Sequence, residues 1–226
     1  MTTATPQGSV ALLRGDSLLA SCVYADEMRH AERLFDTVDQ VLADACWPRR
    51  RVSAIACDVG PGSFTGVRVG VASAKGMALA LGVPLIPVGS LEAMAMAAFA
   101  ALARSVGRVV CVIDAKRKEN FYAVYDRQLR AHRGPAHVAA ADTRAVLGSL
   151  VDDETVRFCG QAARGLGLAP GRLVEEPACT LPHAEWVARR ALALRAVTIP
   201  ALAAVEPMYL RAPDAVPNLP KPLIGG

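Results

Sequence analysis

The chain has 226 residues, of which 53% are hydrophobic and 20% are charged, so it can bury one large core or two small ones. This composition excludes a disordered polypeptide, and no apolar run reaches the roughly 18 residues of a membrane span. The net charge of +4 and the aromatic content of 5% give no basic surface with interleaved rings for nucleic acid. The cysteines are scattered and the start MTTATPQGS is no export signal, so we expect a cytoplasmic protein.

The first hundred residues predict an α/β unit. Residues 9–13 and 18–24 are expected to form two strands around a turn that contains Gly15. Apolar residues then recur at spacings of three and four from Ala31 to Ala45, which predicts an amphipathic helix. A strand at 54–59, a helix at 67–81, a strand at 84–88 and a helix at 90–103 follow in alternation.

The second half restarts the pattern. We expect paired strands at 109–114 and 119–126, a strand near 135–138, a helix at 143–151, a strand at 156–159 and a helix at 183–196. A boundary near residues 103–107 gives a first lobe of residues 1–103 and a second of residues 104–211. The tail, residues 212–226, is rich in proline and glycine and is expected to be extended and mobile.

A glycine-dense segment, GPGSFTGVRVGVASAKGMA, joins the apolar run at 54–59 to the next helix. Glycines without a Cβ let backbone N–H groups approach an anion or a neighbouring backbone. The segment lacks the Lys-Ser/Thr pair of a P-loop, and no acidic residue ends the strand at 84–88 to hold a ribose. It predicts a degenerate phosphate-type loop. Its residues are Gly60, Gly62, Ser63, Thr65 and Gly66, and Ser63 or Thr65 can instead cap the helix.

The sequence offers no catalytic set. The segment around Ser63 does not fit the G-x-S-x-G pattern of a nucleophile elbow. No two of the four histidines lie one helical turn apart beside a carboxylate, which counts against a metallopeptidase. We therefore predict no catalytic residue, no metal and no cofactor.

Residues 60–76, GPGSFTGVRVGVASAKG, with PLIPVGSLEAM at 84–94, VIDA at 112–115 and PMYLR at 207–211, resemble the signature of the TsaB family, also called YeaZ. That family is a subunit of the machinery that places threonylcarbamoyl on adenosine 37 of tRNAs reading codons that begin with A. The resemblance implies a two-lobed actin-like ATPase (ribonuclease H-like) fold. It also implies a non-catalytic subunit that binds and stabilises the catalytic TsaD, with the ATPase TsaE resetting the complex and tRNA reached through it. A homodimer of the free chain is compatible with the same features.

One departure from the family concerns the start of the chain. The family opens with an apolar strand that ends in Asp-Thr-x-Thr, whereas this sequence begins MTTAT and has Thr2 at the Asp position. We expect the first lobe to lack most of its first strand, so that residues 9–13 and 54–59 have no shared neighbour; either the natural start lies upstream or the lobe is weakened. A hydroxyl is also a poor metal ligand, which disfavours the alternative function, an actin-like ATPase or small-molecule kinase. Tight binding of Mg-nucleotide by the isolated chain would distinguish that alternative.

Small residues recur every four positions along the helix at 67–81 and form a smooth stripe. Such a stripe implies a close backbone neighbour, which is either this protein's own sheet or a helix of a partner. The family resemblance implies that helices 31–45 and 67–81 pair with TsaD, with two basic residues flanking the contact. The candidate partner-binding residues are Leu34, Val38, Val41, Arg68, Gly70, Ala74, Lys75 and Ala78.

Overall fold

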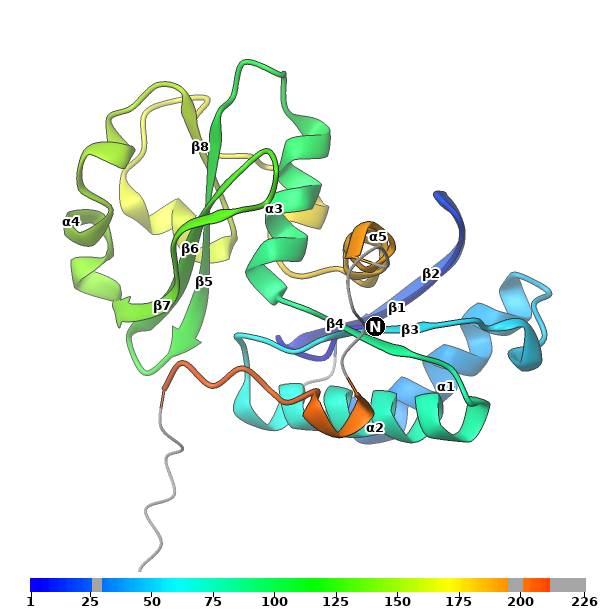
Figure 1. The fold of residues 1–226 in the computed structure, drawn as a ribbon. Coiled ribbons are helices and arrows are strands. Elements are labelled where there is room, and N and C mark those ends of the chain that lie inside the picture. Colours follow the sequence, from blue (N-terminus) through cyan, green and yellow to red (C-terminus); the bar gives the residue numbers. More distant parts are fainter. Residues whose placement is uncertain (26–29, 195–200, 212–226) are drawn as a thin grey trace, which may run out of the picture.

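The computed structural model describes residues 1–25, 30–194 and 201–211, which form two α/β bodies side by side (Figure 1). In the first body, strands β1 (Gln7–Arg14) and β2 (Ser17–Ala25) form an antiparallel hairpin. Its turn contains Gly15 at a φ of 56°, a left-handed conformation that favours glycine. Strands β3 (Ile55–Asp58) and β4 (Leu85–Val88) form a separate parallel pair.

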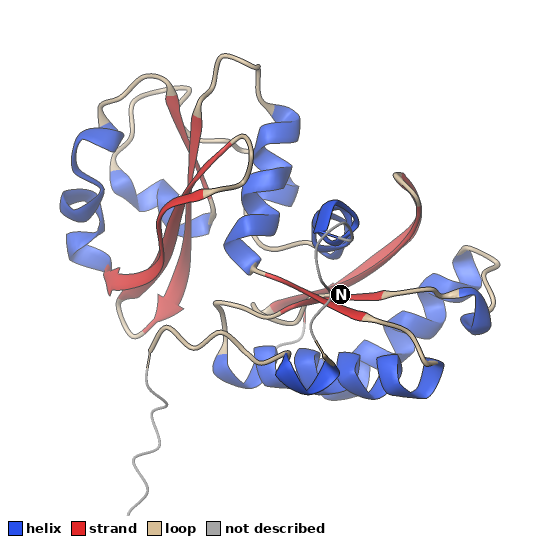
Figure 2. Ribbon diagram, in the orientation of Figure 1, coloured by secondary structure: helices blue, strands red, loops and turns tan. Residues whose placement is uncertain are grey.

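Two helices, α1 (His30–Asp44) and α2 (Phe64–Leu81), cover one face of these strands (Figure 2). Their buried apolar residues form one core with β1, β3 and β4. The helix α2 begins three residues before the expected Val67, because Ser63 caps it. It ends at Gly82, whose φ of 63° is typical of a helix C-terminus.

The first residues partly fill the expected gap between β1 and β3. Thr2 exchanges both backbone hydrogen bonds with Ser9, and the Met1 backbone bonds to Ala56 and Asp58. The strands therefore do share a neighbour at Met1 and Thr2, which corrects the expectation that they have none. Among the described residues this neighbour is two residues long, and none of them pairs its backbone with the rest of the β1 edge that faces β3.

The second body is a four-stranded sheet in the order β7-β6-β5-β8. Its strands are β5 (Arg108–Lys116), β6 (Glu119–Asp126), β7 (Ala131–Ala139) and β8 (Val156–Cys159). Alternate residues of β5 point to opposite faces: Val109, Cys111 and Ile113 belong to one core, and Val110 and Val112 to another. The expected helix at 143–151 is an α-helix, α4 (Thr143–Leu147), followed by a 3₁₀ turn (Gly148–Val151).

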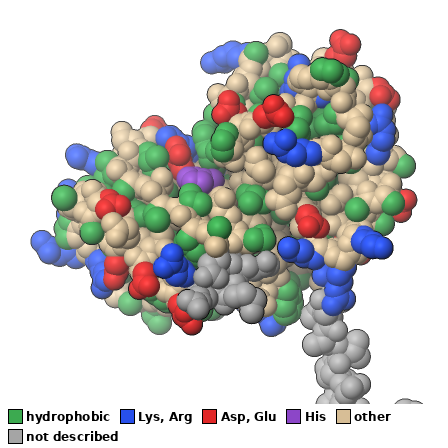
Figure 3. All heavy atoms as spheres, turned by 180° about the vertical axis from the view of Figure 1, so that it is seen from behind, with side chains coloured by type: hydrophobic (Ala, Val, Ile, Leu, Met, Phe, Trp, Pro, Cys, Tyr) green, Lys and Arg blue, Asp and Glu red, His purple; other side chains and the backbone are tan. Residues whose placement is uncertain are grey.

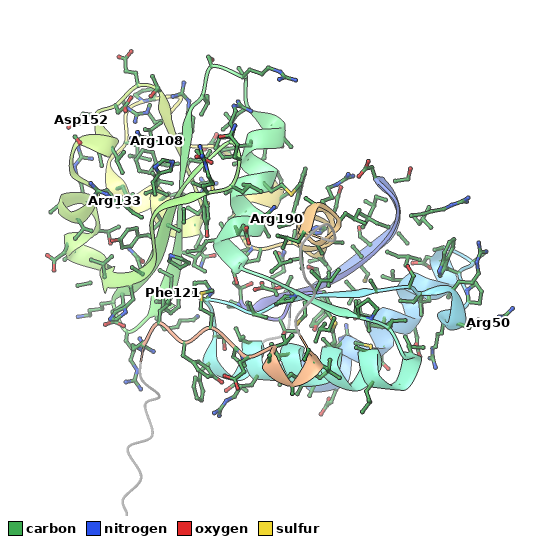
Figure 4. All side chains as sticks on the ribbon, viewed as in Figure 1. Arg50, Arg108, Phe121, Arg133, Asp152 and Arg190 are labelled. Carbon is green, nitrogen blue, oxygen red and sulfur yellow. The ribbon has the colours of Figure 1, made fainter. Side chains whose placement is uncertain are left out.

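The helices do not follow the expected division at residue 103. The helix α3 (Ser90–Ala101) packs on β5 and β6 of the second sheet. The helix α5 (Ala184–Leu194) returns to the first body and packs on β1, β3 and β4, opposite α1 and α2. Arg190 on α5 forms a salt bridge of 2.6 Å with Glu92 on α3, which joins the two helices (Figure 4).

The last described segment, residues 201–211, runs back along α2, and Met208 donates a backbone hydrogen bond of 2.7 Å to Val59. The expected mobile tail, residues 212–226, and the end of the helix expected at 183–196 lie outside the described residues. None of the described helices combines the length and apolar character needed to cross a membrane.

Candidate functional site

The glycine loop between β3 and α2 wraps around the first residues of the chain. A Cβ on Gly62 would lie 2.1 Å from the Ala4 carbonyl oxygen, and one on Gly66 would lie 2.1 Å from the Thr3 carbonyl oxygen. No real Cβ approaches a backbone atom so closely, so these positions accept only glycine. The close neighbour that the glycines admit is thus the protein's own backbone.

Hydrogen bonds within the protein already use several donors of this loop. Ser63 N–H donates to Ala4 O at 2.6 Å, and Gly66 N–H donates to the Ser63 Oγ at 3.3 Å. Gly60 N–H donates to the Asp58 carboxylate at 2.8 Å. Ser63 therefore caps the helix, which is one of the two roles expected for it. Donors that are engaged in this way are not available to cradle a phosphate.

Asp58 is the central buried group of the site, although it was not among the residues predicted to form it. Its carboxylate accepts hydrogen bonds from the Thr2 hydroxyl and the Ser90 hydroxyl, each at 2.6 Å, and from Gly60 N–H. Burial raises the pKa of Asp58, and these bonds oppose the rise. Asp58 thereby ties the first residues, the glycine loop and the start of α3 together. An acidic residue that ends an apolar strand just before a glycine was the available signal.

A cavity of about 210 Å³ lies between the two bodies, beside the loop. The first body contributes residues 62–65 of the loop and residues 4–6 to its walls. The second body contributes the β5–β6 turn and Phe121, which Figure 4 shows at the end of the sheet that faces the first body. Lys116 and Arg117 bring positive charge to the wall, and neither was a predicted site residue. The cavity thus combines Ser63 and Thr65 with three cationic residues, Lys116, Arg117 and Arg211.

The Asp114 carboxylate, which also lines this cavity, accepts a hydrogen bond of 2.7 Å from Lys116 N–H. Residues 116–118 all have positive φ, so the turn holds three consecutive non-glycine residues in the left-handed region. At the cavity's other side, Arg211 pairs with Glu119 at 2.6 Å and holds the pKa of that carboxyl below its usual value. Asp114 therefore acts as a turn former in this structure.

The stripe of small residues on α2 faces the inside of the molecule. Ala74 and Ala78 are fully buried in the core of the first body, and a Cβ on Gly70 would lie 2.4 Å from the Thr3 hydroxyl. Leu34 and Val41 of α1 are buried in the same core. The sequence left two neighbours possible for this stripe, the protein's own core or a helix of a partner. The structure shows the stripe packed in the protein's own core. These five residues are not at the surface, and Val38 is partly buried beside them.

The two predicted basic residues of α2 hold the last described segment. Arg68 Nε donates to the Tyr209 hydroxyl at 2.8 Å, and its guanidinium lies 4.0 Å from the centre of the Phe64 ring. The Lys75 ammonium donates to the Ala203 carbonyl at 3.4 Å. Phe64 and Tyr209 also contact each other, with ring centres 5.0 Å apart. The residues expected to flank a partner therefore contact the chain's own residues 203–209.

The outward side of α1 and α2 carries exposed apolar and small residues that sequence reasoning did not select. Phe35 and Leu79 are 48% and 74% exposed, the largest exposed fractions among the large hydrophobic residues of the described chain. Ala72 and Gly76 precede Leu79 on the exposed side of α2, and a Cβ on Gly76 would meet open space. We call Phe35, Ala72, Gly76 and Leu79 the outer face. In the sequence, Ala72 and Gly76 form a second series of small residues four positions apart. It is hard to recognise because the buried stripe on the same helix has the same spacing.

No group of histidine, cysteine, aspartate and glutamate side chains in the described ranges is arranged to hold a metal ion. Charged side chains of both signs are scattered over the side of the molecule drawn in Figure 3.

Comparison with known proteins gives consistent matches. The family model described as "TsaD: tRNA N6-adenosine threonylcarbamoyltransferase" matches residues 23–156. The TsaB tRNA threonylcarbamoyladenosine biosynthesis protein of Escherichia coli is 32% identical over 230 residues, which cover 96% of each chain. An uncharacterized protein of Mycobacterium tuberculosis is 34% identical over 217 residues, covering 95% of this chain and 92% of that protein.

Solved structures agree with these relatives. A solved structure of YeaZ from Pseudomonas aeruginosa superimposes with a TM-score of 0.76 at 29% identity. The match covers 92% of this chain and 96% of the YeaZ chain.

Proposed function

Because the chain belongs to the TsaB (YeaZ) family, we propose that it acts in tRNA threonylcarbamoyladenosine biosynthesis as a non-catalytic subunit that binds and stabilises a TsaD-like catalytic subunit. In this proposal a TsaE-like ATPase resets the complex, and tRNA is reached through the complex. The two bodies correspond to the two lobes of an actin-like fold.

The observation that carries the proposal is the outer face of α1 and α2. Large exposed apolar side chains at Phe35 and Leu79 are costly on the surface of a monomer unless a partner covers them. On α2, the exposed residues Ala72 and Gly76 have little or no side chain, so another helix can approach the backbone of α2 closely. The proposed contact thus uses the two expected helices but a different side of α2.

The glycine loop supports a structural role in the same proposal. Gly60 N–H donates to the Asp58 carboxylate, Ser63 N–H donates to the Ala4 carbonyl, and Gly66 N–H donates to the hydroxyl that caps α2. The loop therefore positions α2 against the first residues. A loop used in this way presents a rigid helix to a partner without nucleotide chemistry.

The proposal is tested by Gly76→Leu. The change adds a branched side chain where a partner helix at an axial spacing of about 8–10 Å leaves no room for it. In the free protein the side chain enters open space and replaces a poor helix former, so the fold is kept. We expect affinity for the TsaD-like subunit of the same organism, measured by calorimetry, to fall about 100-fold or more.

Gly165→Leu is the matched control, because Gly165 is also exposed with open space around its Cα but lies in the second body. We expect it to bind the partner as the wild type does. Equal binding by all three proteins would show that the outer face is not the contact.

The cavity between the two bodies favours a second candidate, an actin-like ATPase or small-molecule kinase. Its wall combines the loop hydroxyls of Ser63 and Thr65 with Lys116 and Arg117, which suits a phosphate group. Thr2 occupies the position where an acidic residue would help to hold the metal. Calorimetry of the isolated chain with Mg-ATP decides between the candidates, since micromolar affinity and turnover would favour the enzyme.

A further inference from the structure

Three basic residues form the turn between β5 and β6 in a backbone conformation that does not favour them. Lys116, Arg117 and Lys118 have φ values of 64°, 54° and 61°. Arg117 and Lys118 are the two loop residues between the paired Lys116 and Glu119, and a two-residue loop with positive φ at both positions usually contains glycine or asparagine. Residues with a larger side chain are less stable in this conformation. Strain of this kind is concentrated at functional sites, so the three cations are candidates for a function.

A fourth cation lies beside this turn. Arg211, from the last described segment, pairs with Glu119 at 2.6 Å, and Figure 1 shows that segment ending next to the β5–β6 turn. Residues 116–118 are exposed to solvent. Asp114 and Glu119 bring negative charge to the same place, so four cations lie beside two carboxylates. The surface around the turn is therefore positively charged.

Two aromatic rings line the same cavity as the turn. Tyr209 is 44% exposed, and its ring centre lies 5.0 Å from that of Phe64. The Arg68 guanidinium lies 4.0 Å from the Phe64 ring centre and 5.7 Å from the Tyr209 ring centre. Both rings border the cavity together with Lys116 and Arg117. An exposed ring beside cationic side chains is a surface on which an unpaired base can stack.

The combination of cations and an exposed ring favours one class of ligand. The cations alone suit any polyanion, including an acidic protein segment. The ring favours a nucleic acid, because each unpaired nucleotide combines a phosphate with a base that stacks. The sequence showed no basic surface with interleaved rings, because residues 64–68, 116–118 and 209–211 are far apart along the chain and only the fold brings them together.

We propose that residues 116–118, Arg211 and Tyr209 form a binding surface for a single-stranded RNA segment. The side chains of the turn and Arg211 contact the phosphates, and one base stacks on the Tyr209 ring. The inference rests on the proposed function, in which the RNA is a tRNA. It extends that function, because this chain then contacts tRNA directly as well as through the other subunits.

The test uses the full-length chain and a fluorescein-labelled, unmodified tRNA that reads a codon beginning with A. Fluorescence anisotropy should show saturable binding at about 0.1 M salt, and the affinity should fall as the salt concentration rises, because bound phosphates release counterions. A fully paired RNA duplex of similar length is expected to bind about tenfold more weakly, since its bases are not available to the Tyr209 ring.

A double variant of the turn, Arg117→Asn with Lys118→Gly, separates binding from stability. It supplies the residues that the turn conformation favours, so its melting temperature should rise. It should also bind the tRNA about tenfold more weakly, and the slope of log Kd against log salt should fall by about 1.4, since each phosphate contact contributes about 0.7. The control, Arg50→Asn with Arg104→Asn, removes the same charge at two exposed positions away from the turn, and Figure 4 shows Arg50 at the far end of the first body. It should bind as the wild type does.

A pair of variants at Tyr209 tests the stacked base. Tyr209→Leu removes the ring and should weaken binding about fivefold or more. Tyr209→Phe keeps the ring and loses only the hydroxyl that accepts from Arg68, so it should retain most of the affinity. Equal affinity of Tyr209→Leu and the wild type would contradict the stacking contact.

The proposal is overturned if the wild-type chain does not bind the tRNA, or if the control double variant weakens binding as much as the turn variant does. Equal affinity for poly-glutamate would assign the surface to an acidic protein segment, and displacement of the tRNA by micromolar Mg-ATP would assign it to a nucleotide. Either result contradicts the proposal. These assays contain no TsaD-like subunit, so their failure is distinct from a failure of the proposed function, which Gly76→Leu tests.

Discussion

Asp58 shows how much of the first body depends on single residues. Its carboxylate joins Thr2, Gly60 and Ser90, which belong to three segments that are distant in the sequence. Because it is buried, its charged form is disfavoured and its pKa is raised above the ordinary value of 3.8.

The raised pKa predicts how Asp58 affects stability at different pH. Below 3.8 both the folded and unfolded chains carry the proton, and the contribution of Asp58 is fully present. As pH rises, the unfolded chain loses its proton first, and this contribution is lost toward the folded pKa. We therefore expect Asp58→Asn to gain stability relative to the wild type as pH rises above 3.8, measured by urea unfolding.

Asp126 provides a control with the opposite sign. Burial opposes the shift, but hydrogen bonds from Arg130 and His132 lower the pKa of Asp126 to about 2. Its contribution is present above 3.8 and is lost as pH falls toward about 2. Asp126→Asn should therefore be destabilised relative to the wild type at neutral pH, with a difference that shrinks on acidification. The same pH trend for both variants would contradict the account of Asp58.

Gly70 and Gly76 differ in what surrounds them, although both lie on α2. Gly70→Leu overpacks the contact with Thr3 and is expected to destabilise the fold by about 1–3 kcal/mol. For a chain of this size that corresponds to a fall in melting temperature of roughly 2–12 °C. Gly76→Leu should not lower the melting temperature, as circular dichroism on both variants can show. Equal melting of Gly70→Leu and the wild type would mean that the stripe is not packed in the core.

At the scale of elements, periodicity predicted the strands and helices well, because each apolar pattern matches one buried face. The pattern on α2 was ambiguous, since small residues at one spacing mark a close neighbour without saying which one it is. The structure resolves this with the first residues of the chain, whose carbonyls at Thr3 and Ala4 touch Gly66 and Gly62. Contacts between segments so far apart in the sequence leave no local pattern to read.

The segment 202–211 and α2 form a second long-range pairing, which Arg68 holds through Tyr209 and Phe64. We expect Arg68→Ala to release this segment, so that its amides exchange hydrogen faster while those of the β5–β6 hairpin do not change. Arg104→Ala is the control, because Arg104 is exposed in the loop before β5. Unchanged exchange at residues 202–211 would show that Arg68 does not hold the segment.

At the scale of the whole molecule, the sequence predicted two α/β units but not how they are joined. The helices α3 and α5 each leave the strands that precede them and pack together, with the partly buried pair of Arg190 and Glu92 between them. The sequence does not reveal that these two charged residues pair, because they are 98 positions apart and no local pattern connects them. Likewise, the cavity wall formed by Lys116, Arg117 and residues 208–211 depends on how the two bodies meet.

The most direct test of the proposed function is transfer of threonylcarbamoyl to tRNA, measured with the TsaD-like and TsaE-like proteins of the same organism in the presence and absence of this chain. We predict that this chain alone modifies no tRNA and that the other components need it for robust modification. Gly76→Leu should lose the ability to support modification in parallel with its loss of binding, and Gly165→Leu should retain it. Robust modification by the highly purified chain alone, abolished by a point change within it, would contradict the account.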